Sequence, residues 1–371
     1  MTDILDRPRD VTVEPGKTRL KIIDSDIHPS LANSAALHPF LAANWREHLI
    51  QYGIRPHGIY ADRGTYPRFT PNTARRDSWP PNGQPPGSDL AFLQQQHLDA
   101  YDIEIGILEP LIQANVSRNL EFGAALVSAA NDWQIETFTA KEKRLRASIL
   151  IPAEDAEASV FEIEKRAIDS HFAQIQLGSR SVEPIGRKRY WPIFEAAQAA
   201  NLPIGFHVGG PSAHSPSPSG WPSFYAEDHH DLVHSMQAQV SSMILEGVFE
   251  HFPKLRVVMI EGGFAWAPSL AWRLDAHWAK MRNETPHVKM KPSEYMRRNV
   301  WFSTQPVEEP ENPEDLRKIC EWIGWDRLLY ASDYPHWDFD DPSRAFPIVM
   351  SEQEKRMLFH DNAVAFYQLK D

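Results

Sequence analysis

The sequence has one cysteine, Cys320, and no apolar stretch long enough to cross a membrane. A single cysteine excludes an internal disulfide and a cysteine-based metal cluster. Cys320 lies in LRKICEWIG, at helical spacing among apolar neighbours. We expect it to be a buried helix residue, because a reactive thiol needs a nearby base or positive charge. A membrane span is not expected, because it needs roughly 18 consecutive apolar residues.

Basic residues are also scarce. The chain has 38 Lys and Arg against 50 Asp and Glu, a net charge of −12, which argues against a nucleic-acid partner. The first 19 residues are polar and lack the apolar centre of a secretory signal. We expect a short N-terminal arm over residues 1–19, one domain over residues 20–371, and a cytoplasmic location.

What the chain does contain is a series of short, almost continuous apolar runs. Such runs are typical of strands that are buried on both faces, as in a parallel sheet. The predicted strands are residues 20–28, 103–110, 145–152, 172–178, 202–210, 255–263, 299–306 and 328–336.

Amphipathic stretches such as 159–171, 190–202 and 234–253 separate these runs. Eight strands alternating with helices predict an α/β fold, and eight is the strand count of the (β/α)₈ TIM barrel. A doubly wound open sheet would show the same alternation. Two long segments, 29–92 and 208–233, are predicted as loop insertions after the first and fifth strands. Long loops in compact domains often bind substrate, although a surface or subunit-contact role is equally compatible.

The ends of the predicted strands carry polar side chains that suit a metal site. Asp26 and His28 end the first strand, His207 the fifth, Glu261 the sixth and Asp333 the eighth. In a TIM barrel, catalytic groups come from the C-terminal ends of several strands. Asp26 and His28 are two residues apart, so both side chains can point to one face of a strand. We predict Asp26, His28, His207 and Asp333 as ligands of one divalent cation, zinc first, with manganese or iron as alternatives.

In this pattern the chain resembles the amidohydrolase superfamily. It is most similar to the amidohydrolase-related branch, which includes aminocarboxymuconate-semialdehyde decarboxylase, resorcylate-type decarboxylases and several lactone and amide hydrolases. The resemblance extends from about Lys21 to Tyr367. The family's H-x-H or E-x-H pair corresponds to Asp26 and His28, its strand-five histidine to His207 and its strand-eight aspartate to Asp333.

The chain departs from this family where many relatives have a histidine at the end of strand six, because it has Glu261 there. In the decarboxylases that histidine is thought to activate water or to handle a proton. Glu261 could be a base, a further ligand or a structural salt-bridge partner. It favours hydrolysis over decarboxylation by the usual route.

Other residues are weaker candidates. We predict Asp333, Glu261 and His336 as catalytic, and Gln176, Arg75 and Arg76 as substrate contacts. His336 could instead be bonded to backbone, Gln176 could serve packing, and the two arginines could be solvated loop charges. His229 and His230 are adjacent and so poorly placed to share one ion; they are interpreted as loop residues or subunit contacts.

The sequence therefore predicts a metal-dependent hydrolase that uses activated water on a small cyclic or aromatic substrate. The alternative within the family is a non-oxidative decarboxylase of an aromatic or muconate-type acid. An alternative of another class is a metal-free barrel that serves as a binding protein. The resemblance also implies a homo-oligomer.

Overall fold

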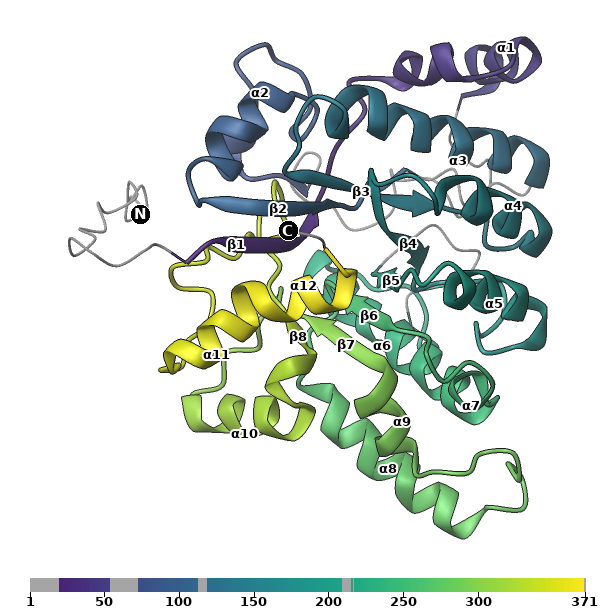
Figure 1. Cartoon of the computed structure of the whole chain (residues 1–371), viewed down its shortest axis with the longest axis vertical. Coiled ribbons are helices and arrows are strands. Elements are labelled where there is room, and N and C mark those ends of the chain that lie inside the picture. The colour runs from purple at the N-terminus through teal and green to yellow at the C-terminus, as the bar shows by residue number, and fades with distance from the viewer. Residues whose placement is uncertain (1–19, 54–72, 113–118, 209–214, 216, 370–371) are drawn as a thin grey trace.

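A parallel sheet of eight strands, in the order in which they occur along the chain, forms the centre of the protein (Figure 1). The computed structural model describes residues 20–53, 73–112, 119–208, 215 and 217–369. The predicted arm, residues 1–19, lies outside them. Every predicted apolar run contains a strand. The strands are β1 (Ile22–Ile27), β2 (Ile103–Leu108), β3 (Leu145–Leu150), β4 (Phe172–Gly178), β5 (Ile204–His207), β6 (Val257–Ile260), β7 (Val300–Ser303) and β8 (Leu328–Leu329).

The sheet closes on itself between its last and first strands. The Ser25 amide donates to the Tyr330 carbonyl at 2.9 Å, and the His28 amide donates to the Tyr334 carbonyl at 2.7 Å. Ile27 and Tyr334 form a parallel bridge. The predicted TIM barrel is thus confirmed, and the open-sheet alternative is wrong.

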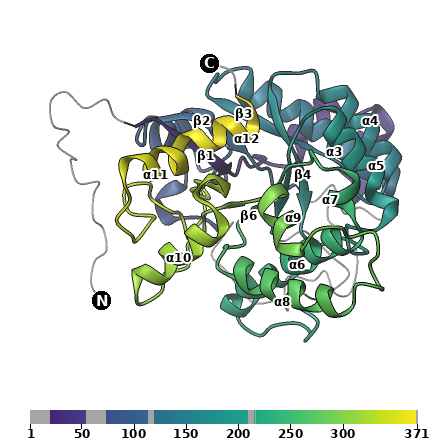
Figure 2. The same cartoon turned by 60° about the horizontal axis from the view of Figure 1, so that its bottom comes forward.

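Helices surround the strands in both views (Figures 1 and 2). Several begin at a side chain that caps the free amides of the first turn, such as Asn119 and Asp155. The α-helices are α1 (Ala43–Tyr52), α2 (Leu90–Leu93), α3 (Leu120–Gln134), α4 (Ala156–Arg166), α5 (Trp191–Ala199), α6 (Tyr225–Leu245), α7 (Val248–His251), α8 (Trp266–Lys280), α9 (Pro292–Asn299), α10 (Pro313–Ile323), α11 (Glu352–Arg356) and α12 (Asn362–Tyr367). Shorter helical turns are η1 (Ser34–Phe40), η3 (Arg76–Ser78), η4 (Gln94–Leu98), η6 (Ile135–Thr139), η7 (Lys188–Tyr190), η8 (Trp325–Arg327) and η9 (Met357–Asp361).

The first predicted insertion returns to the mouth of the barrel. After η1 and α1, and beyond residues 54–72, which are not among the described residues, the chain pairs with the segment that follows β8. The Arg75 amide donates to the Pro335 carbonyl at 3.0 Å, and the Trp337 amide donates to the Thr73 carbonyl at 2.8 Å. This insertion therefore supports the segment that carries Asp333 and His336.

The second predicted insertion is shorter than expected. We interpreted residues 208–233 as loop, but α6 begins at Tyr225. The predicted helix over 234–253 is also divided, because Gly247 adopts a left-handed φ of 84° before α7. His229 and His230 consequently lie on a helix rather than in a loop.

Apolar side chains fill the opposite end of the barrel. Phe366 of α12 shares a buried cluster with Ile23, Ile107, Val258 and Leu329 from the strands. Both views show α12 against β1 (Figures 1 and 2). The cluster closes this end, so the polar residues gather at the other.

Two expectations about the rest of the chain can be compared with the structure. Cys320 is fully buried on α10, as predicted. Burial raises the pKa of its thiol to about 12, which leaves it unreactive at neutral pH. Among the described helices, none has both the length and the apolar character to cross a membrane.

Candidate metal centre

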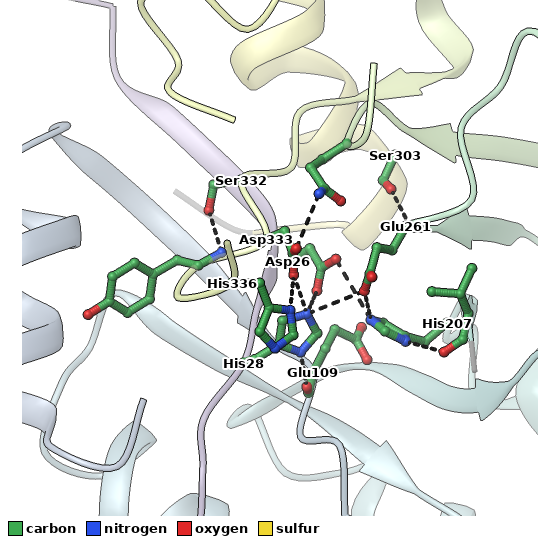
Figure 3. A network of polar contacts seen from close by, with 12 residues as sticks. Asp26, His28, Glu109, His207, Glu261, Ser303, Ser332, Asp333 and His336 are labelled. Atoms are coloured by element: carbon green, nitrogen blue, oxygen red, sulfur yellow. Dashed lines mark hydrogen bonds and ion pairs between the residues drawn. The ribbon is translucent and has the colours of Figure 1, made fainter. Parts of the chain in front are cut away.

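The four predicted ligands meet at the C-terminal mouth of the barrel (Figure 3). Each of these residues is at most 3% exposed. Asp26 lies in β1 and His28 follows it, His207 ends β5, and Asp333 follows β8. His28 Nε2 is 3.1 Å from Asp26 Oδ1 and 2.8 Å from Asp333 Oδ1. His207 Nε2 is 3.9 Å from Asp26 Oδ2. The structure thus brings together residues from opposite sides of the barrel.

Both histidines are oriented by backbone carbonyls. His28 Nδ1 donates to the Glu109 carbonyl at 2.6 Å, and His207 Nδ1 donates to the Val208 carbonyl at 2.7 Å. A carbonyl only accepts, so each Nδ1 carries a hydrogen, and in the neutral ring Nε2 is the nitrogen whose lone pair can bind a metal. This is how metal-binding histidines are usually held.

The atoms that face the centre of the site lack hydrogen-bond partners. Within the described part of the chain, this holds for Nε2 of both histidines, both oxygens of Asp26 and Oε2 of Glu261. Buried polar atoms are rarely left in this condition. The Nε2 atoms of the neutral histidines lie close to carboxylate oxygens, and the lone pairs of these atoms repel one another. A cation bound between them would remove this repulsion. The donor set therefore fits a divalent metal ion.

Glu261, the residue after β6, joins this set. Its Oε2 is 2.9 Å from His207 Nε2 and 3.8 Å from His28 Nε2. Glu261 and Asp333 have left-handed backbones, with φ of 59° and 61°. Such values are uncommon outside glycine and gather at functional sites. Glu261 can be a further ligand or a base beside the metal.

The charges of the site are unbalanced without a cation. Burial, and then neighbouring carboxylates such as Glu261, raise the pKa of Asp333 well above its usual value; burial also raises the pKa of Asp26. Burial lowers the pKa of His28 well below its usual value. Burial opposes the charged form of His207, but Glu261 outweighs it and raises the pKa of His207 to about 10. Protons thus compensate for the charge that a divalent ion would otherwise neutralise.

Two further side chains fix Asp333. His336 Nδ1 donates to Asp333 Oδ1 at 2.5 Å, and its ring stacks on His28 at 4.3 Å. Gln305 Nε2 donates to Asp333 Oδ2 at 3.1 Å and to Asp338 Oδ2 at 3.0 Å. The structure therefore places His336 in the site, where we predicted a catalytic role.

The predicted substrate contacts are more scattered. Gln176, on β4, is 5% exposed, and its Oε1 has no hydrogen-bond partner among the described residues. Arg75 forms a two-pronged pair with Asp77, at 3.0 and 2.6 Å, and stacks on Phe339. Arg76 is exposed. Gln176 stays a candidate contact, whereas the Arg75 guanidinium already holds a carboxylate.

Sequence reasoning missed Glu109 and misinterpreted His229. Glu109 follows β2 and is fully buried; burial raises its pKa to about 8. The rule that selected Glu261, a carboxylate directly after a strand, would have found it. His229 lies on α6, with Nε2 3.2 Å from Asp338 Oδ2 and 3.9 Å from Glu261 Oε1. Our interpretation of His229 as a loop or subunit-contact residue is wrong about the loop, because the start of α6 was not recognised.

Comparison with known proteins decides the family. The amidohydrolase family model matches residues 23–369. The chain belongs to the amidohydrolase family. This agrees with the resemblance that the strand-end residues suggested.

Proteins similar to this chain include decarboxylases of aromatic acids. The chain is 25% identical over 300 residues to a gamma-resorcylate decarboxylase from Polaromonas sp. (strain JS666 / ATCC BAA-500), covering 76% of this chain and 88% of the relative. A 5-carboxyvanillate decarboxylase from Novosphingobium aromaticivorans with bound manganese superposes with a TM-score of 0.71 at 20% identity, over 94% of this chain and 97% of the other. A dihydroxybenzoic acid decarboxylase from Polaromonas sp. JS666, with manganese and 2-nitroresorcinol, superposes with a TM-score of 0.66 at 19% identity, over 94% and 97%.

Proposed function

We propose that this protein is a manganese-dependent, non-oxidative decarboxylase of a hydroxylated aromatic acid. The observation that carries the proposal is the buried set of imidazole nitrogens and carboxylates without partners, in a chain related to gamma-resorcylate decarboxylases. The sequence had favoured hydrolysis and kept decarboxylation as the alternative. The similarity to decarboxylases makes decarboxylation the first candidate and hydrolysis the second.

Manganese replaces zinc as the first choice of metal. Two solved structures of the same fold contain bound manganese and an aromatic ligand. A site of mixed nitrogen and oxygen donors, rich in carboxylates, suits Mn²⁺ as well as Zn²⁺. Asp26, His28 and His207 would hold the ion, and Asp333 would be the fourth protein ligand.

The bound cation would neutralise the crowded carboxylates and attract an anionic substrate. In the reaction, the ring carbon that bears the carboxylate gains a proton, and the carbon–carbon bond breaks to release CO₂. Asp333 would deliver this proton. The hydrogen bond from His336 Nδ1 fixes the direction of its carboxyl group.

Hydrolysis is the second candidate, and Glu261 favours it. Its carboxylate lies 2.9 Å from His207 Nε2, where a general base for an attacking water would be needed. A carboxylate so close to the metal position could remove a proton from that water. Lactones and cyclic amides therefore belong in the substrate panel.

The test combines metal analysis with a substrate panel. The protein is stripped, reloaded with Mn²⁺ or Zn²⁺, and assayed for CO₂ release from 2,6-dihydroxybenzoate and 5-carboxyvanillate. We expect about one ion per chain, turnover with Mn²⁺, and loss of both in His28→Ala and His207→Ala. Turnover of lactones or amides instead would favour hydrolysis. Failure to bind any metal would favour the metal-free binding protein.

A further inference from the structure

We propose that His229 and Glu261 together bind a hydroxyl group of the substrate, next to the metal centre. This inference rests on the proposed function, because it assumes that the substrate is a hydroxylated aromatic acid. It assigns His229, which the sequence analysis had not placed in the site, a role in substrate selection.

The separation between the two side chains supports this subsite. His229 Nε2 and Glu261 Oε1 are 3.9 Å apart, too far for a direct hydrogen bond. One oxygen atom between them could reach both, as bridging waters do. A hydroxyl fits chemically, since it accepts from the imidazole N–H and donates its own hydrogen to the carboxylate.

Glu261 connects this subsite to the metal centre. Its Oε2 lies 2.9 Å from His207 Nε2, whereas its Oε1 is the oxygen nearer His229. The two oxygens of one carboxylate therefore face two different positions. A ring whose carboxylate occupies the metal centre would bring a neighbouring substituent toward Oε1.

A charge contact with Asp338 holds the imidazole of His229 in place. Its Nε2 lies 3.2 Å from Asp338 Oδ2, and Gln305 Nε2 donates to that oxygen at 3.0 Å. The same amide nitrogen donates to Asp333 Oδ2 at 3.1 Å. The position of His229 is thus tied through Asp338 and Gln305 to a carboxylate of the metal centre.

Aromatic rings flank the subsite, and the His229 side chain between them is partly exposed. The His229 ring packs against Tyr225 at 5.8 Å and against Trp337 at 5.7 Å. Trp337 Nε1 donates to Tyr225 Oη at 3.2 Å. The His229 side chain is 22% exposed, against 2% for His28 and 4% for His207. A substrate entering from solvent could therefore reach His229 alongside an indole face suited to an aromatic ring.

The test compares two substrates that differ by one hydroxyl in the Mn²⁺-loaded enzyme. We measure kcat and KM for 2,6-dihydroxybenzoate and 2-hydroxybenzoate, and the affinity for each by calorimetry. A site that hydrogen-bonds a hydroxyl discriminates strongly against the analogue that lacks it. We expect wild type to prefer the dihydroxy acid, and His229→Ala to lose about 10- to 100-fold of that preference, mostly in KM and affinity.

The neighbouring His230 provides a matched control. Its ring contacts His234 instead, at 5.6 Å, so His230→Ala should keep the wild-type preference. His229→Gln retains an N–H donor and should restore part of it, while bound manganese stays at wild-type level in all three variants.

Two outcomes separate the inference from the proposed function. If wild type decarboxylates aromatic acids but His229→Ala loses activity equally on both substrates, the hydroxyl subsite is wrong and the proposed function stands. If wild type neither turns over nor binds either acid, the proposed function fails and the subsite with it.

Discussion

Asp24 and Asp26 are two residues apart on β1, and both are fully buried. Asp24 is surrounded by donors: its oxygens accept from the Ser332 amide at 2.9 Å, from the Ser332 hydroxyl at 2.5 Å, from His97 Nε2 at 2.7 Å and from the Asp26 amide at 3.2 Å. Asp26 is the opposite case. Neither of its carboxylate oxygens has a hydrogen-bond partner among the described residues.

The difference separates a structural carboxylate from one that is ready to bind. Asp24 joins β1 to the segment after β8 and so holds Asp333 beside Asp26. Its partners satisfy it within the protein, as buried charges require. Asp26 has no such donors, so a bound ligand would have to interact with its carboxylate oxygens instead. The register of β1 against β2 shifts between Asp24 and Ile27, and such irregularities often redirect side chains beside active sites.

Substitution of Asp26 should have the largest effect on metal binding. We expect Asp26→Asn to lower Mn²⁺ affinity by more than the roughly 10- to 100-fold typical of residues that only support a ligand. The metal-free protein should be as stable as wild type or more stable, because the change replaces a buried carboxyl group whose oxygens lack hydrogen-bond partners. Calorimetric titration with Mn²⁺ and urea unfolding of the metal-free protein measure the two quantities. A large loss of stability would show that Asp26 is structural after all.

Substitution of Asp24 should mainly lower the stability of the protein and have a smaller effect on metal affinity, the reverse of Asp26→Asn. In Asp24→Asn the amide cannot accept from every donor that Asp24 satisfies, so we expect the free energy of unfolding to fall by about 3 kcal/mol. Mn²⁺ affinity should fall less than in Asp26→Asn, by about 10-fold, through the displaced Asp333. Urea unfolding and Mn²⁺ titration again report both. Ser332→Ala, which removes one of the four donors, should lie between Asp24→Asn and wild type in stability.

The same two residues show how far the sequence could lead. The apolar runs and the polar residues at their ends were sufficient to predict the barrel and the convergence of Asp26, His28, His207 and Asp333. Strand alternation predicts which residues share a face, and the parallel strands end at the same side of the barrel. These predictions needed only local pattern and one general property of the fold.

The features that the sequence did not predict depend mainly on contacts between distant segments. Apart from the Asp26 amide, the partners of Asp24, which are His97 and Ser332, are 73 and 308 residues away, so no local pattern could distinguish it from Asp26. His229 reaches Glu261 only because α6 begins at Tyr225, within a segment whose proline- and glycine-rich beginning predicted loop throughout. The pairing of Arg75 with Asp77, two residues away, was within reach of the sequence, but the choice between this partner and a substrate was not.

Glu109 lies between these two extremes, and its effect shows only when the pH is changed. Its Oε1 accepts from Ser148 Oγ at 3.1 Å and also from Gln174 Nε2, whereas Oε2 has no partner within the described residues. Burial raises the pKa of its carboxyl group from 4.5 to about 8. Between these two values the folded protein keeps a proton that the unfolded chain releases. The stability from this group is therefore fully present below about pH 4.5 and is lost as the pH rises to about 8.

Glu109→Gln should remove this pH dependence, because the amide resembles the protonated acid at every pH. The metal-free wild type should lose stability from pH 5 to pH 8 with a contribution from Glu109 of up to about 1.4 kcal/mol per pH unit, and the variant should lack it. Urea unfolding at pH 5, 6.5 and 8 measures the slope. Glu142→Gln is the control: the hydrogen bond from Arg144 lowers the pKa of Glu142 to about 2, so its carboxylate is ionised in both states over this range and the slope should not change. Equal slopes in wild type and Glu109→Gln would mean that Glu109 is already ionised in the folded protein, and therefore that it belongs with Asp24 as a fully compensated charge.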